Sequence, residues 1–277
     1  MTNLAQRVLV GVVAIPIIYL LCMAGGLYFF AFAAIASGLA LHEFYGLARA
    51  KGARPLTWLG IAAGFFVNLS FLRVTLQTPP LAVVLTVSAL AMALCELFRD
   101  EGSAIVNLST TVFGVLYVSL FFGTLIGIRD LDTATAALPA PYSGGAMVMA
   151  MLVTIWICDS AAFHIGKPFG AHKLYPRVSP QKSWEGAVAG LAGAVITAVV
   201  AKYIALPFLP LPGAVYLGII VGTVGQMGDL VESLLKRDAG VKDSSTLIPG
   251  HGGVFDRFDS VLLVAPCLFL YLDCILF

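Results

Sequence analysis

Nine apolar runs, most of them close to the length of a bilayer-spanning helix, constrain this chain more than any other feature of its sequence. A transmembrane helix needs about 20 mainly apolar residues. Hydrophobic residues make up 60% of the chain and charged residues 11%, more apolar surface than a soluble core of this size needs. We therefore predict an all-α integral membrane protein with about nine transmembrane helices. The runs fall near 7–25, 26–47, 56–75, 80–98, 104–128, 145–167, 184–206, 211–236 and 258–277.

The basic residues are distributed unevenly between the two sides of this topology. With a cytoplasmic N-terminus, 13 of the 16 Lys and Arg residues fall on the inner side, and Arg73, Arg129 and Lys202 fall on the other. Cytoplasmic loops of membrane proteins carry an excess of Lys and Arg. The sequence therefore predicts a multi-pass protein of the inner (cytoplasmic) membrane, with its N-terminus inside, its C-terminus outside and its polar site at the cytoplasmic face.

Composition also argues against several classes of function. The net charge of +1 offers no broad basic face for a nucleic-acid partner. No internal repeat is visible, so the inverted-repeat pattern of many transporters is missing. The five cysteines lie inside apolar runs without CxxC spacing, which indicates reduced, buried thiols rather than disulfides or a zinc site.

The residues that carry chemistry gather in the C-terminal half. We expect 1–150 to form the N-terminal transmembrane helices, about five spans and the start of a sixth, and 151–277 to form a catalytic transmembrane region. Ionisable groups at membrane depth are costly and usually face a cavity or a partner. In the first part these groups are His42, Glu43 and Glu96, which fit either that role or interfacial anchoring, so their roles stay open.

Acidic residues flank the polar loop between the eighth and ninth predicted spans. Asp229, Glu232 and Lys236 are spaced three and four apart, so they share one helix face. Asp256 and Asp259 are three apart and are predicted to share a face where the ninth span starts. Neighbouring carboxylates cannot all stay ionised without a cation, and Mg²⁺ favours oxygen ligands. The alternative is a set of salt bridges within the stretch, such as Glu232 with Lys236.

The same loop contains the run Pro-Gly-His-Gly-Gly at 249–253. Glycine-rich backbone can approach a ligand closely and turn its N–H groups toward an anion. A glycine cluster alone is a weak signal, but this one lies between Lys242 and the acidic pair. That position favours a phosphate site.

A second polar stretch covers 159–186 and begins with Asp159 near the inner end of the sixth span. Glycines and prolines predict an irregular loop there. Ser183 is predicted to cap the next helix, with Glu185 in its first turn. A purely topological, positive-inside loop is the alternative. The basic residues of this loop are Lys167, Lys173, Arg177 and Lys182.

The order of residues in these stretches closely resembles the signature of phosphatidate cytidylyltransferases (CDP-diacylglycerol synthases). The resemblance is dense over 159–260, and over 1–150 it is little more than membrane-helix character. The matching residues are Asp159-Ser160, Gly166-Lys167, Leu174, Ser179-Pro180-x-Lys182-Ser183-Trp184-Glu185-Gly186, Ser233-x-x-Lys236-Arg237, Lys242-Asp243 and Pro249-Gly250-His251-Gly252-Gly253-x-x-Asp256-Arg257-x-Asp259.

The resemblance implies that CTP and phosphatidate of the inner leaflet react to give CDP-diacylglycerol and pyrophosphate. Mg²⁺ is the expected cofactor, with a second cation as an option. Membrane lipids are expected partners, and a homodimer is one option for an oligomeric state that the sequence leaves open. Phosphatidate is already ionised near neutral pH, so the reaction needs no general base. His251 is then expected to be a positioning donor.

We assign three roles to the residues of the two stretches. Metal binding is assigned to Asp229, Asp256 and Asp259. The catalytic set is Asp229, Asp256, Lys236, Arg237 and His251. The substrate-binding set is Lys167, Ser179, Lys182, Lys242, Gly252, Gly253 and Arg257, of which Lys167, Lys182 and Arg257, with Lys236 and Arg237, are expected to hold phosphates.

Two other functions fit parts of this pattern. A CTP-dependent lipid-alcohol kinase shares the location and the metal but needs a base for a hydroxyl group. A cation-coupled transporter is the non-enzymatic option, and its polar groups should lie near the middle of the membrane. Here the polar groups cluster at one predicted face, which argues against the transporter.

Overall fold

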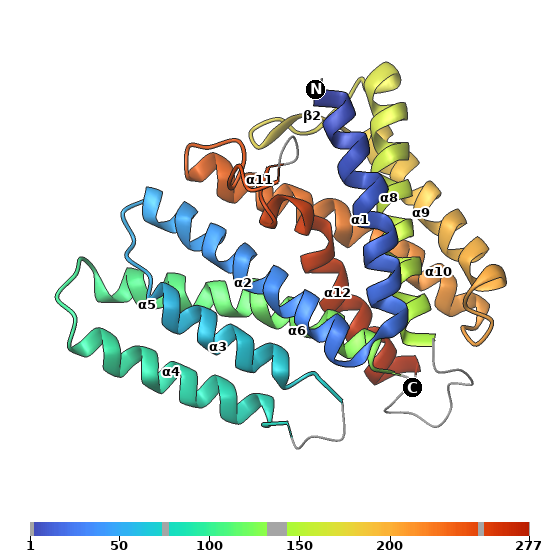
Figure 1. The fold of residues 1–277 in the computed structure, drawn as a ribbon. Helices are drawn as coiled ribbons and strands as arrows, with labels where there is room; N and C mark the ends of the chain where they lie inside the picture. The colour runs from blue at the N-terminus through green and yellow to red at the C-terminus, as the bar shows by residue number, and fades with distance from the viewer. Residues whose placement is uncertain (1–2, 74–77, 132–142, 249–251, 277) are drawn as a thin grey trace. The chain divides into compact units, whose positions relative to one another are not determined.

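The structure is a computed structural model that describes residues 3–73, 78–131, 143–248 and 252–276 (Figure 1). Helices account for almost all of its regular structure, and the described residues form one two-stranded sheet. The chain divides into two compact units. The first comprises Met1–Asp130 and Leu235–Phe258, and the second comprises Leu131–Leu234 and Asp259–Phe277.

In the first unit, α2 packs against α3, α5 and α6, with α4 flanking α3 (Figure 1). Its buried face includes Leu41, Phe44 and Tyr45. A side chain at Gly114 of α5 would collide with all three, so this glycine permits the close approach of α5 to α2. The elements are α1 (Asn3–Ala24), α2 (Gly26–Ala50), α3 (Thr57–Leu69), α4 (Leu81–Leu97), α5 (Ala104–Gly114), the π-helical turn η1 (Val115–Ser119), α6 (Leu120–Arg129) and the 3-10 turn η3 (Phe255–Arg257).

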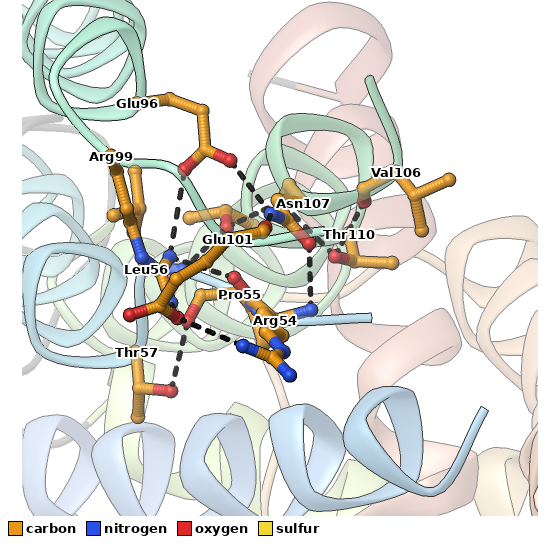
Figure 2. Close-up of polar contacts among 11 residues, drawn as sticks. Arg54, Pro55, Leu56, Thr57, Glu96, Arg99, Glu101, Val106, Asn107 and Thr110 are labelled. Atoms are coloured by element: carbon orange, nitrogen blue, oxygen red, sulfur yellow. Dashed lines mark hydrogen bonds and ion pairs between the residues drawn. The ribbon is translucent and has the colours of Figure 1, made fainter. Parts of the chain in front are cut away.

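A polar network joins the α2–α3 connection to the α4–α5 turn in this unit (Figure 2). Buried Glu96 accepts a hydrogen bond from Asn107 Nδ2 at 2.7 Å, and Asn107 Oδ1 accepts one from the Arg54 N–H at 2.7 Å. Arg99 donates to the Arg54 carbonyl at 2.8 Å and pairs with Glu101 at 2.5 Å. The hydrogen bond from Arg99 lowers the pKa of Glu101 below its usual value. This network ties the α2–α3 connection to the end of α4 and the start of α5, and it gives the buried Glu96 carboxylate a hydrogen-bond partner.

In the second unit, α9 packs closely on α8 and α10. A side chain at Gly186 would collide with the Ala162 carbonyl of α8, and one at Gly218 would collide with the Val195 backbone. A side chain at Gly190 would be in tight contact with Ala162. Small residues spaced by four allow such contact between membrane helices. The elements are α8 (Ser143–Phe169), β1 (Lys173–Tyr175), β2 (Ser179–Ser183), α9 (Trp184–Ile204), α10 (Leu211–Ile220), the π-helical turn η2 (Val221–Gly225), α11 (Gln226–Asp238, of which the last turn belongs to the first unit), α12 (Asp259–Tyr271) and the π-helical turn η4 (Leu272–Leu276).

Among the described residues, six helical stretches are long and apolar enough to cross a membrane, and three more apolar helices are shorter. Each of these helices overlaps one of the predicted apolar runs, so the chain is a helical, multi-pass membrane protein as the sequence predicts. The six are Gly26–Ala50, Ala104–Arg129, Ser143–Phe169, Trp184–Ile204, Leu211–Asp238 and Asp259–Leu276. The shorter three are Gly11–Ala24, Thr57–Leu69 and Leu81–Leu97.

The loop between α8 and α9 corrects one prediction and confirms another. The irregular loop expected after Lys167 contains an antiparallel hairpin, in which Lys173 pairs with Ser183. The prediction of an irregular loop was wrong because Pro176 and Pro180 lie at the turn and the edge of the hairpin, where proline is tolerated. The predicted helix cap is confirmed, since the Ser183 hydroxyl accepts a hydrogen bond from the Gly186 N–H at 3.2 Å.

Candidate functional site

Three carboxylates meet in the second unit. Ligand-capable oxygen atoms of Asp229, Glu232 and Asp259 all lie within 4.8 Å of one another. Glu232 is buried, while Asp229 and Asp259 are half-buried. Like charges at this separation repel each other unless a cation or protons intervene.

Helix geometry explains why these residues meet. Asp229 and Glu232 lie three residues apart in the first turns of α11, on one face of the helix. Asp259 begins α12, and a side chain at Gly228 would collide with the Asp259 carbonyl. The glycine therefore lets the start of α12 approach α11 closely enough for the three carboxylates to cluster.

The donor set suits a hard divalent cation. Mg²⁺ binds through carboxylate oxygens and keeps several waters, so two or three carboxylates are a suitable protein contribution. Two of the acids, Asp229 and Asp259, belong to the predicted metal set. The predicted metal set did not include Glu232. The signal for it is present in the sequence, because the three-residue spacing from Asp229 places both carboxylates on one helix face.

Lys182 lies beside this acidic cluster. Its ammonium group is 2.8 Å from Asp229 Oδ2 and donates to the Gln226 carbonyl at 3.3 Å. Strand β2 holds Lys182 near its end and half-buried Ser179 at its start. Asp159 of α8 interacts electrostatically with both Asp229 and Lys182. The second unit thus brings together cationic and acidic residues that the sequence assigned to phosphate and metal.

Asp256 has a different environment, within the first unit. Its Oδ1 is 2.8 Å from Lys236 Nζ, and its Oδ2 accepts hydrogen bonds from the Gly253 N–H at 2.7 Å and the Ser244 N–H at 3.0 Å. The prediction that Asp256 opens the ninth helix is wrong. Asp256 lies in the turn η3, and α12 starts three residues later, because the carboxylate folds back onto the preceding loop.

The two glycines before this turn are needed for the loop itself. Gly252 has a φ of 81°, and a side chain there would meet the Asp256 carboxylate. A side chain at Gly253 would collide with the Ser244 hydroxyl and with Glu43 of α2. Glu43, whose role the sequence left open, is therefore in contact with the candidate site loop.

The other predicted site residues are more accessible or lie outside the described part of the chain. Lys167 lies over the Phe163 ring at 5.6 Å, and Arg237 donates to the Val241 carbonyl at 3.4 Å. His251 lies outside the described residues. The exposed basic residues among those predicted to bind substrate or act in catalysis are Lys167, Arg237, Lys242 and Arg257.

Comparison with known proteins covers nearly the whole chain. A sequence model of the cytidylyltransferase family matches residues 5–275. A phosphatidate cytidylyltransferase of Synechocystis sp. is 32% identical over 284 residues, spanning 96% of this chain and 95% of the relative. One of Bacillus subtilis is 30% identical over 279 residues, spanning 98% of each. One of Haemophilus influenzae is 42% identical over 134 residues, 46% of this chain and 45% of the relative.

Proposed function

The chain belongs to the cytidylyltransferase family, and from that premise we propose that it transfers a cytidylyl group from CTP to phosphatidate. A phosphate oxygen of phosphatidate attacks the α-phosphorus of CTP. The bond from that phosphorus to the bridging oxygen of the β-phosphate breaks, and the products are CDP-diacylglycerol and pyrophosphate. The observation that carries this proposal is the carboxylate cluster of Asp229, Glu232 and Asp259 with Lys182 beside it.

The acidic cluster is the proposed place for Mg²⁺. When bound, the ion neutralises the triphosphate, polarises the reacting phosphorus and stabilises the departing pyrophosphate. Asp229, Glu232 and Asp259 would hold it through carboxylate oxygens. Asp256 is the remaining member of the predicted metal set, and its carboxylate accepts hydrogen bonds within its own loop. If a second cation takes part in the reaction, Asp256 is the proposed source of negative charge for it.

The basic residues would orient the two anionic substrates. In the structure Lys182 and Lys236 each neutralise a carboxylate, Asp229 and Asp256 respectively. A lysine ammonium has three donors on a flexible stem, so each can contact a phosphate without a change in backbone. Exposed Lys167, Arg237, Lys242 and Arg257 are suited to the outer phosphates and the lipid headgroup.

Placement in the membrane forms part of the same proposal. Nine spans with an inner N-terminus put the two polar stretches at the cytoplasmic face, where CTP is dissolved and inner-leaflet phosphatidate is exposed. The bias of 13 basic residues against three supports this orientation. The inner membrane is then where the reaction takes place. A homodimer is the oligomeric state that we include in this proposal.

The experiment that tests the function follows the label of CTP into lipid. Purified protein in phosphatidate-containing micelles with Mg²⁺ receives CTP labelled at either the α- or the γ-phosphorus. Cytidylyl transfer predicts that α-label enters lipid and that γ-label leaves as pyrophosphate. Incorporation of γ-label into lipid would instead identify a lipid kinase.

A further inference from the structure

Glu43 is a carboxylate buried in an apolar helix. It is 6% exposed and lies in the second half of α2. An isolated carboxylate in such surroundings is very unfavourable unless it is well hydrogen-bonded. Its hydrogen-bond partners lie more than 200 residues further along the chain.

Four donors from the candidate site loop converge on this carboxylate. Oε1 accepts from the Ser245 hydroxyl at 2.7 Å and from the Val254 N–H at 3.1 Å. Oε2 accepts from the Phe255 N–H at 2.8 Å and from the Ser244 hydroxyl at 2.9 Å. A carboxylate has about four lone-pair sites, so these four donors are a full set.

These contacts hold both ends of the loop segment that carries the glycines and Asp256. Ser244 lies at its start, and its N–H donates to Asp256 at 3.0 Å. The single proton of its hydroxyl is shared between Glu43 Oε2 at 2.9 Å and Asp256 Oδ2 at 3.1 Å. Val254 and Phe255 lie at its end, immediately before Asp256. Gly253 packs directly against the Glu43 carboxylate, so the backbone there cannot shift without disturbing Glu43.

We propose that Glu43 is a positioning residue for cytidylyl transfer, acting through the described parts of the loop, residues 244–248 and 252–257. Its carboxylate sets the position of Asp256 and of the Gly252–Gly253 backbone, and a loss of these hydrogen bonds lowers turnover beyond any loss of stability. This inference rests on the proposed function. It differs from that function in placing part of the catalytic machinery on an N-terminal helix.

Glu96 provides a matched control in the same unit. It is also buried, at 4% exposed, and also belongs to an apolar helix. Its carboxylate bonds instead to Asn107 at 2.7 Å and Arg99 at 3.5 Å, and this network connects helix ends (Figure 2). The same Glu-to-Gln change can therefore be made at both residues. Only Glu43→Gln alters an acceptor of hydrogen bonds from the candidate site loop.

The Glu43→Gln variant cannot reproduce the native pattern. Each carboxylate oxygen faces one backbone N–H, and an amide has just one oxygen. Whichever way the amide turns, its NH₂ group faces either the Val254 or the Phe255 N–H. A hydroxyl can rotate away from such a donor, whereas a backbone N–H cannot.

The test compares Glu43→Gln with Glu96→Gln in Mg²⁺-dependent CDP-diacylglycerol synthesis, with rates normalised to folded protein. We expect kcat of Glu43→Gln to fall at least tenfold, the size of one charge-assisted contact, with a smaller change in KM for CTP. Glu96→Gln should lose thermal stability and keep its kcat. Equal kcat per folded molecule in both variants would overturn the proposal.

Hydrogen exchange separates this inference from the proposed function. Amides of peptides covering 252–257 should exchange at least tenfold faster in Glu43→Gln than in the wild type, and unchanged exchange would overturn the proposal. If the wild type makes no CDP-diacylglycerol, the proposed function fails, while the exchange result still decides whether Glu43 fixes the loop. If Glu43→Gln does not fold, Ser245→Ala, which removes one of the four donors, must lower kcat severalfold, and an unchanged kcat contradicts the inference.

Discussion

The Lys236 ammonium group lies 2.8 Å from the Asp256 carboxylate, and the two side chains are 12% and 2% exposed. In the other unit, Lys182 lies at the same distance from Asp229. Each pair joins a residue predicted to bind or act on phosphate to a residue predicted to bind metal. Loss of one partner therefore costs more stability in the buried Lys236–Asp256 pair than in the Lys182–Asp229 pair, whose side chains are 23% and 34% exposed.

Asp256→Asn tests whether that carboxylate is needed for catalysis or serves as a salt-bridge partner. The amide keeps the shape and one acceptor for the Gly253 N–H but removes the negative charge. We expect Mg²⁺-dependent activity to collapse while the protein still inserts and stays folded. Turnover and thermal stability should be measured together on this variant.

The control for that variant is Asp243→Asn, in the same loop but exposed. It should keep most of its activity. If folded Asp256→Asn protein retained substantial Mg²⁺-dependent turnover, Asp256 would be only a structural ion-pair partner of Lys236 and would not be needed for catalysis.

Lys182→Ala tests the phosphate contact from strand β2. The change removes a cation and leaves the carboxylate cluster in place, so apparent CTP affinity should fall. A hydrogen bond to a charged group contributes about 1.5–3 kcal/mol, which corresponds to roughly a ten- to hundredfold rise in KM for CTP. An unchanged KM for both substrates with normal turnover would mean that Lys182 does not contact substrate and that the basic residues between α8 and α9 only set the membrane topology.

Glu232→Gln tests the acidic cluster as a Mg²⁺ site. Removing the charge of Glu232 weakens cation binding and also removes its repulsion with Asp229 and Asp259. We therefore expect the Mg²⁺ concentration for half-maximal activity to rise at least severalfold, while thermal stability without Mg²⁺ stays equal or increases. Identical Mg²⁺ dependence in the variant and the wild type would exclude Glu232 from the site.

Topology provides a test that needs no activity. Single cysteines at 51 and 242 should react with a reagent added to the cytoplasmic side, and a cysteine at 132, outside the described residues, should react from the other side. The 13-to-three distribution of basic residues motivates this expectation. Labelling of positions 132 and 242 from the same side would contradict the nine-span arrangement.

Local features of the fold followed from the sequence because local spacing controls them. Apolar runs predicted the helices, the Ser183 cap was confirmed, and the three-residue spacing of Asp229 and Glu232 placed both on one face. The hairpin that begins at Lys173 was not predicted, since cross-strand pairing is weakly encoded in so short a segment. The predicted apolar run at 258–277 begins close to the start of α12 at Asp259, whereas the short 3-10 turn that holds Asp256 before it was not predicted.

The contact of Glu43 with the loop could not be predicted for a different reason. Its partners Ser244 and Val254 are separated from it by 201 and 211 residues, and no local pattern reports such a pairing. The sequence indicated a costly ionisable group and left its purpose open. The three-dimensional fold shows the hydrogen-bond partners of Glu43, as it shows Asn107 as the partner of Glu96.

The most direct measurement of the central claim is the yield of pyrophosphate and CDP-diacylglycerol from purified wild-type protein with CTP, phosphatidate and Mg²⁺. The account predicts equal molar amounts of the two products, with formation that requires both substrates and stops when EDTA removes the metal. Release of CDP or inorganic phosphate in place of pyrophosphate, or no turnover by folded protein in lipid micelles, would contradict it.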